Sequence, residues 1–235
     1  MKFLVNPRKF NDIADNIFRP LLILSIIMFA LGLLFSFYLS PDDYQQGSTV
    51  RIMYVHVPSA WLALLTYAIM TLYSILALAF RIPFGFIFNT AVAPIGAVFT
   101  LICIISGSLW GKPMWGTGWV WDARLTSVAL LFIIYLIIIF MNLSFENRIV
   151  REKVVAIFIL VGSVNLPIVK FSVDWWNTLH QPASIKLTGT STIHSSMLMP
   201  LFLMFFVLLL YCALIFLMKY KTEIIRIKKK NLKRL

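Results

Sequence analysis

The chain has 235 residues, of which 60% are hydrophobic and only 13% are charged. This composition excludes an ordinary soluble domain and is typical of an integral membrane protein. The net charge of +12 does not point to nucleic acid, because most basic residues flank apolar runs, where they set membrane topology. Both cysteines, Cys103 and Cys212, fall inside apolar runs, so neither a disulfide framework nor a thiol pair is expected.

Six apolar runs are long enough to cross a bilayer, for which a helix needs roughly 20 residues. The fifth is the weakest because Ser163, Asn165 and Pro167 interrupt it, although proline is tolerated where neighbouring helices satisfy the freed carbonyl. We therefore predict an all-α integral membrane protein, a single polytopic domain with six transmembrane helices. The expected spans are residues 20–39, 57–80, 87–109, 125–142, 154–170 and 197–218.

Lys and Arg are unevenly divided between the two sides of this arrangement. Sixteen of the 21 lie on the side that holds both termini, and five lie on the other side. Because cytoplasmic segments carry the excess of Lys and Arg, both termini are predicted to be cytoplasmic. The basic tail after Met218 is expected to lie against anionic lipid. The segments predicted to face outward are residues 40–56, 110–124 and 171–196.

The predicted outward segments contain most of the residues with unusual chemistry. All three histidines, His56, His180 and His194, lie there. An aromatic belt would place tryptophan at both membrane faces, yet the predicted cytoplasmic segments contain none. A belt therefore does not account for the outward tryptophans, which are Trp110, Trp115, Trp119, Trp121, Trp175 and Trp176.

The segment WGTGWVWDARLTS, residues 115–127, concentrates tryptophan in front of the fourth span. If it is helical, Trp115 and Trp119 share one face that ends at Asp122, whereas the nearby glycines would interrupt a long helix. The second cluster, SVDWWNTLHQ, repeats this arrangement: if it is helical, Val173, Trp176 and His180 share one face. An amphipathic segment lying in the membrane interface is the plain alternative.

A flat aromatic surface beside outward histidines suits a flat, apolar, metal-bearing ligand, and imidazole is a usual axial ligand of haem iron. Arg124, beside the tryptophans, and Arg51, five residues before His56, are suited to the two haem propionates because a guanidinium offers a forked donor. Asp122 is expected to order the loop rather than touch the ligand. It would pair with Arg124 or accept indole and backbone N–H bonds.

At this point the sequence resembles a known family. WGKPMWGTGWVWDARLTS, residues 110–127, is similar to the WWD signature of haem-handling membrane proteins, and specifically of the haem exporter protein C family (CcmC) of cytochrome c maturation. YVHVPSAW at 54–61 and VDWWNTLHQ at 173–181 support the resemblance in the same order, so that it covers essentially the whole chain.

The resemblance implies a site and a function. Haem b would be held transiently and non-covalently at the periplasmic face of a bacterial-type inner membrane, by the tryptophan platform and one histidine from each flanking loop. Carried over by position, the axial ligands of the haem iron are His56 and His180. Haem would then pass to the chaperone CcmE. No catalysis is expected of the chain itself, other than promotion of covalent haem attachment to that chaperone.

The family resemblance also implies partner proteins, and the sequence departs from the family pattern at two positions. ABC-type subunits and a small membrane subunit are implied, and ATP use falls to another chain because this one lacks a G-x-x-x-x-G-K-[ST] loop. Gly118 stands where many family members have a further tryptophan. His194 has no counterpart and is expected to be solvated or interfacial.

Two other functions remain as alternatives. A haem-translocating permease would need polar or ionisable residues within its spans, and these spans have almost none apart from Asn165. A b-type electron-transfer cytochrome would place its histidines inside helices on facing sides of a bundle, whereas His56 and His180 are expected at or beyond span ends. A merely structural membrane subunit does not explain tryptophans on one side only.

Overall fold

The computed structural model describes residues 7–80, 83–182, 185 and 193–232. Within these residues there is no β-strand, and six helices are long and apolar enough to cross a membrane. The predicted all-α fold with six membrane-spanning helices is confirmed. The elements are α1 (Pro7–Leu33), the π-helical η1 (Leu34–Leu39), the 3-10 turn η2 (Ser48–Ile52), α2 (Met53–Phe80), α3 (Pro83–Trp115), α4 (Ala123–Ser144), α5 (Arg148–Gly162), α6 (Asn165–Trp175) and α7 (Ser195–Leu232).

Several helices extend beyond the apolar runs that predict them. α1 begins 13 residues before Pro20, at Pro7, and α7 continues past Met218 to Leu232. The added turns are rich in Lys, Arg and Asn, so their low hydropathy hides them, although Lys and Arg favour helix well. The hydrophobic pattern therefore predicts the part of each helix that is suited to lipid. The helix continues beyond that part until a capping residue or a turn terminates it.

The fifth crossing is made by two helices, α5 and α6, which meet at Ser163 and Val164. Hydrogen bonds continue across the break: the Ser163 N–H donates to the Ile159 carbonyl at 3.0 Å, the Tyr67 hydroxyl donates to the same carbonyl at 3.1 Å, and the Leu166 N–H donates to the Ser163 carbonyl at 3.0 Å. Gly162 lies against the Tyr67 hydroxyl so closely that any Cβ would collide with it. The carbonyl of Ser163, to which Pro167 cannot donate, is thus paired within the segment, and α2 adds a further bond at the interruption.

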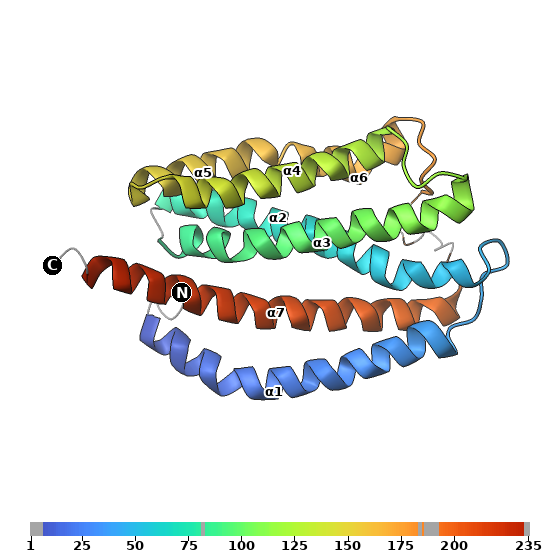
Figure 1. The fold of residues 1–235 in the computed structure, drawn as a ribbon, viewed down its shortest axis with the longest axis horizontal. Helices are drawn as coiled ribbons and strands as arrows, with labels where there is room; N and C mark the ends of the chain where they lie inside the picture. The colour runs from blue at the N-terminus through green and yellow to red at the C-terminus, as the bar shows by residue number, and fades with distance from the viewer. Residues whose placement is uncertain (1–6, 81–82, 183–184, 186–192, 233–235) are drawn as a thin grey trace.

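Two layers of helices flank a central pair (Figure 1). α2 and α3 pack along most of their length, with α4, α5 and α6 on one side and α7 on the other, and α1 packs chiefly along α7. Tyr135 of α4 crosses the core, where its hydroxyl donates to the Ala63 carbonyl at 2.8 Å and lies 2.9 Å from the Thr66 hydroxyl. Its ring fills the notch left by Gly96 on α3. Small residues let helices approach closely where lipid supplies no hydrophobic drive.

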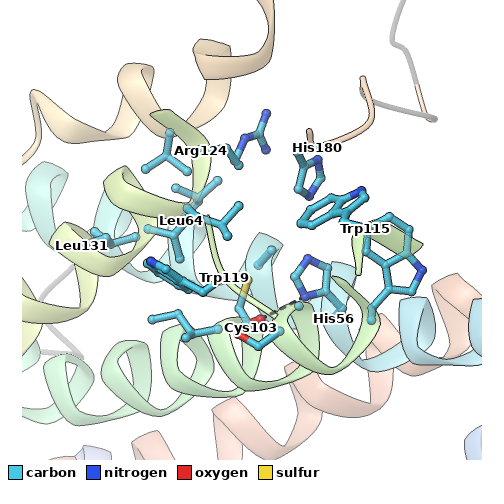
Figure 2. A pocket seen from close by; sticks show the side chains of 17 residues that line it. His56, Leu64, Cys103, Trp115, Trp119, Arg124, Leu131 and His180 are labelled. Atoms are coloured by element: carbon cyan, nitrogen blue, oxygen red, sulfur yellow. Dashed lines mark hydrogen bonds between the residues drawn. The ribbon is translucent and has the colours of Figure 1, made fainter. Parts of the chain in front are cut away.

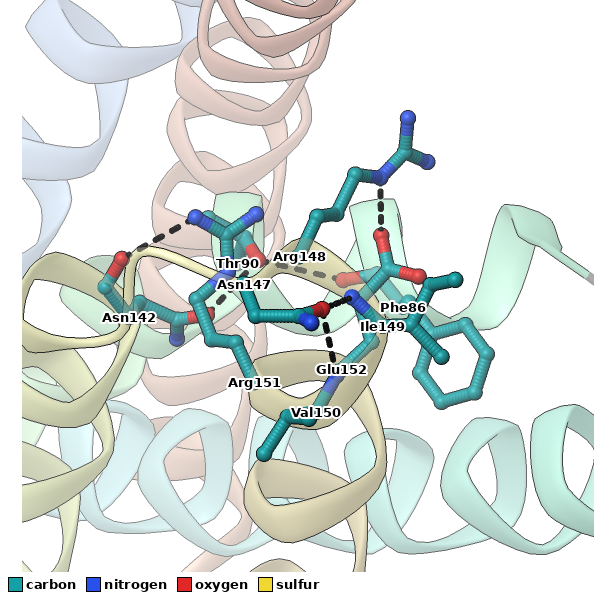
Figure 3. A network of polar contacts seen from close by, with 9 residues as sticks. All are labelled: Phe86, Thr90, Asn142, Asn147, Arg148, Ile149, Val150, Arg151 and Glu152. Carbon is teal, nitrogen blue, oxygen red and sulfur yellow. Dashed lines mark hydrogen bonds and ion pairs between the residues drawn. The ribbon is translucent and has the colours of Figure 1, made fainter.

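The two ends of the bundle differ in character. The start of α1 and the end of α7 lie at one end, which we call the terminus end (Figure 1). A polar network there joins α3, α4 and α5 (Figure 3). Asn147 caps α5 by accepting from Ile149 N, the Thr90 hydroxyl of α3 donates to the Asn142 side chain of α4 at 3.1 Å, and Arg151 of α5 donates to the Asn142 carbonyl at 3.4 Å. The opposite end, the loop end, holds η2 and residues 116–122, 176–182 and 193–194.

The notch at Gly96 predicts a position-specific loss of stability. Gly96→Ala forces a Cβ into the ring of the fully buried Tyr135 and should lower the free energy of unfolding by about 1–3 kcal/mol, as overpacking does. Gly32→Ala is the matched control, because its Cβ would meet the flexible Met204 Sδ at 2.7 Å, which can move aside. Thermal unfolding in detergent measures both. Equal losses in the two variants would contradict the notch.

Candidate functional site

A pocket lies at the loop end, among the start of α2 and α4, the end of α3, and α6 with the segment that follows it (Figure 2). Its volume is about 90 Å³. The outer part is aromatic and polar, and the inner part reaches into the bundle between aliphatic side chains. It is lined by His56, Ala60, Ala63, Leu64, Cys103, Ile104, Gly107, Ser108, Trp110, Trp115, Trp119, Arg124, Leu125, Val128, Leu131, Val169 and His180.

His56 belongs to a helix, contrary to its predicted place at a loop end. α2 begins at Met53, so His56 lies in its first turn. The imidazole Nδ1 lies 3.0 Å from the Cys103 carbonyl oxygen and 3.1 Å from the Ser106 hydroxyl, both on α3. Because a carbonyl oxygen only accepts, the contact with Cys103 requires the proton on Nδ1. The other nitrogen, Nε2, therefore carries the free lone pair in the neutral ring.

A glycine on α3 makes room for this ring. A Cβ at Gly107 would lie 2.9 Å from the Cε1 atom of His56, which is closer than real Cβ contacts. Gly107 thus permits the imidazole to lie flat against α3 while Nδ1 reaches Cys103. Sequence reasoning missed Ser106, Gly107 and the Cys103 carbonyl. The one available signal was the run of small residues on α3, CIISGS, which reads equally well as ordinary helix packing.

His180 faces His56 from the segment after α6. The two ring centroids are 6.3 Å apart and the ring planes make an angle of 33°. His180 Nδ1 lies 2.9 Å from the Gln181 carbonyl oxygen, so the same reasoning places its proton on Nδ1 and its lone pair on Nε2. Burial in the pocket lowers the pKa of His180 below its ordinary value of about 6.5, which favours the neutral ring at pH 7.

The tryptophan segment is not a continuation of α3. Gly116 adopts a φ of 75° directly after Trp115, a conformation that glycine adopts readily, and residues 116–122 are irregular. Trp115 and Trp119 consequently do not share a helical face, and the conditional prediction of an i, i+4 platform fails. Likewise α6 ends at Trp175, so the helical face proposed to reach His180 does not form.

Three of the six predicted tryptophans line the pocket. Trp110 and Trp115 pack edge to face with centroids 5.1 Å apart, and the Trp115 ring lies 6.4 Å from His180. Trp119 lines the other side and packs against Trp121 at 5.4 Å. Trp121 itself is 80% exposed. The exposed residues of the six, none of which lines the pocket, are Trp121, Trp175 and Trp176.

The two predicted arginines occupy different surroundings. Arg124 lines the pocket, and its Nε donates to the Ser172 hydroxyl of α6 at 2.7 Å. Arg51 does not line the pocket and pairs with Asp42 at 3.0 Å. Its side chain is therefore engaged within its own loop, and only Arg124 is placed beside the two histidines.

Asp122 contacts two segments through its two carboxylate oxygens. Oδ1 accepts from the Leu125 N–H at 2.8 Å and so caps the start of α4. Oδ2 accepts from the Leu179 N–H at 3.3 Å, next to His180. Asp122 was expected to pair with Arg124 or to accept indole and backbone N–H bonds, and in the structure it accepts two backbone N–H bonds.

His194 differs from the other two histidines in its hydrogen bonds. Its Nδ1 accepts from the Ser196 backbone N–H at 3.3 Å and lies 2.7 Å from the Ser196 hydroxyl. A backbone N–H only donates, so Nδ1 carries the lone pair and Nε2 carries the proton in the neutral ring. His194 is exposed just before α7 and does not line the pocket.

Comparison with known proteins gives a consistent result along the whole chain. The family model described as heme exporter protein C matches residues 1–235. Heme exporter protein C of Bradyrhizobium diazoefficiens is 43% identical over 97% of this chain and 87% of its own, and that of Escherichia coli K12 is 41% identical over 90% and 85%. A putative cytochrome c biosynthesis ccmC-like mitochondrial protein of Marchantia polymorpha is 52% identical over 75% and 74%.

Proposed function

The chain belongs to the haem exporter protein C family, and from this premise we propose that it holds haem between His56 and His180 and presents it to the chaperone CcmE. Membership supports the coarser statement directly: the protein is a multi-pass membrane protein that handles haem for cytochrome c maturation. The residues that bind haem and the recipient are the proposal. So is the setting, the periplasmic face of an inner membrane, which the uneven distribution of Lys and Arg favours.

The paired imidazoles are the observation that carries the proposal. A metal ion bound by two imidazole nitrogens, at about 2.0–2.1 Å from each, holds the two ring centres roughly 6 Å apart. The centroids of His56 and His180 are 6.3 Å apart. In both rings Nδ1 is bonded to a backbone carbonyl, an arrangement that fixes the tautomer of metal-binding histidines and leaves Nε2 for the metal.

The surroundings favour haem over a bare metal ion. No group of three or more His, Cys, Asp or Glu side chains suited to a metal is found among the described residues, so a set of three protein ligands for a bare ion is not in place around the two imidazoles. A porphyrin supplies the remaining four nitrogens itself. The aliphatic and tryptophan lining suits its apolar ring, and Arg124 at the rim is suited to a propionate. Arg51 is a weaker propionate partner because Asp42 already pairs with it.

The position of the pocket supports presentation rather than enclosure. The two imidazoles and the three tryptophans that line it lie at the loop end of the bundle, whereas its aliphatic lining lies deeper between the helices (Figure 2). The exposed tryptophans around the loop end offer an apolar surface to an incoming protein. ABC-type subunits and a small membrane subunit remain proposed partners on family grounds.

The position of His56 weakens the argument that both histidines lie outside helices, which spoke against an electron-transfer cytochrome. His56 lies within α2, as a cytochrome ligand would, but His180 lies in an irregular segment after α6. A ligand on such a segment is suited to exchange, because the segment can move without rearranging the bundle. Transfer by ligand exchange therefore fits this site better than permanent retention.

The ligand assignment predicts the spectrum of bound haem. The wild-type protein loaded with ferric haem should be six-coordinate and low-spin, and His56→Ala or His180→Ala should shift the Soret band and lower the haem content about tenfold or more. His194→Ala is the matched control and should resemble the wild type, because its Nε2 is protonated and it lies outside the pocket. A loss of haem in His194→Ala equal to that in His180→Ala would refute the assignment.

Binding and delivery are predicted to separate at two neighbouring tryptophans. Trp119→Ala removes a pocket wall and should weaken haem retention by about 0.5–1.5 kcal/mol, less than loss of either histidine. Trp121 is 80% exposed and does not line the pocket, so Trp121→Ala should retain haem while reducing transfer. Haem bound to the protein and haem attached to CcmE, measured in the same membranes, distinguish the two. If Trp121→Ala empties the site as completely as His180→Ala, the division is wrong.

A further inference from the structure

Asp122 joins two segments that are far apart in the sequence and meet at the pocket. One carboxylate oxygen accepts from Leu125 N, in the first turn of α4, and the other accepts from Leu179 N. Leu179 immediately precedes His180, and Asp122 immediately follows the tryptophan segment that contains Trp119 and Trp121. A single side chain thus connects the start of α4, the tryptophan segment and the backbone that carries one imidazole.

The segment that carries His180 has few other polar attachments. The Trp176 N–H donates to Ser172, and the contacts of Thr178 and His180 with carbonyls stay within residues 176–182. Among hydrogen bonds between described residues, that of Leu179 with Asp122 is the one that joins residues 176–182 to an element other than α6. Without it, the described residues would hold the backbone beside His180 only through side-chain packing, the bond from Trp176 to α6 and the bonds within residues 176–182.

A second attachment fixes the preceding helix but ends short of the histidine. Arg124 Nε donates to the Ser172 hydroxyl, and Arg124 NH2 lies 3.5 Å from the Lys170 carbonyl oxygen. These bonds hold α6 against the start of α4. α6 ends at Trp175, five residues before His180, so they do not constrain the direction in which the imidazole points.

We propose that Asp122 is the positioning residue for His180, holding its backbone so that the imidazole stays opposite His56 while the same carboxylate caps α4. This inference rests on the proposed function, because the ligand role of His180 is part of that function. It assigns Asp122 no contact with haem. The two roles use the two oxygens of one carboxylate, Oδ1 for Leu125 N and Oδ2 for Leu179 N.

The chemistry of the carboxylate separates its two roles. Asn and Ser cap helices about as well as Asp, so Asp122→Asn and Asp122→Ser keep an acceptor for Leu125 N–H. Each offers only one acceptor atom, however, and leaves the Leu179 N–H without its partner. Asp174→Asn is the matched control, because Asp174 is exposed on α6 and its charge also acts on Arg124. It removes the same charge without touching either bond.

The test is a titration of ferric protoporphyrin IX into purified full-length protein, followed by visible spectra. Asp122→Asn and Asp122→Ser should bind about tenfold more weakly than wild type, and their spectra should shift towards that of His180→Ala. Free imidazole should restore the six-coordinate low-spin spectrum in both variants, as in His180→Ala, by replacing the misplaced ligand. Asp174→Asn should match wild type in affinity and spectrum.

The outcomes separate this inference from the proposed function. Wild-type affinity and spectra in both Asp122 variants, with a changed spectrum in His180→Ala, would overturn the positioning role alone. Loss of haem that imidazole does not restore, accompanied by a lower thermal unfolding temperature than in Asp174→Asn, would show that capping is the only role and would also overturn it. A His180→Ala protein indistinguishable from wild type would instead refute the proposed function.

Discussion

Two hydrogen bonds to backbone carbonyls set the character of the loop end: His56 Nδ1 to Cys103 and His180 Nδ1 to Gln181. Each fixes a tautomer, so that both rings present an unprotonated Nε2 in the same pocket, with ring centroids 6.3 Å apart. The site, as we propose it, depends on this pairing. A change that frees either ring would leave the pocket with one fixed ligand. Imidazoles whose orientation is fixed by hydrogen bonds bind a metal more tightly than imidazoles that are free to rotate.

The bundle places the two rings by different means. His56 is positioned by the close packing of α2 on α3, where Gly107 leaves space for the ring. His180 is positioned through hydrogen bonds to its segment and to the helix before it. Arg124 bonds Ser172 of the short α6, and the carboxylate of Asp122 bonds Leu179 N. The first support is as rigid as the central helix pair. The second depends on an irregular segment, and such segments open at lower free energy than packed helices, which suits a protein that must release what it binds.

The sequence predicts the helices and the residue types of the site, but not how the helices end. Apolar runs identify six spans because lipid permits no other kind of crossing for this composition. Gly116 takes a φ of 75° and ends α3, and the tryptophan segment then folds back so that Gly118 lies against the Ser108 carbonyl of α3, a path that residue spacing alone does not reveal. Helix α2 also starts earlier than its apolar run, which puts His56 inside it. Of the predicted residues, Trp121, Trp175, Trp176 and Arg51 do not line the pocket, because exposure and a local ion pair depend on tertiary packing.

The most direct measurement of the central claim is electron paramagnetic resonance of the wild-type protein loaded with ferric haem, with the histidine ring nitrogens isotopically labelled. Two imidazole ligands predict a low-spin signal with hyperfine coupling to two labelled axial nitrogens. A high-spin signal, or a low-spin signal coupled to one labelled nitrogen only, would contradict ligation by both His56 and His180.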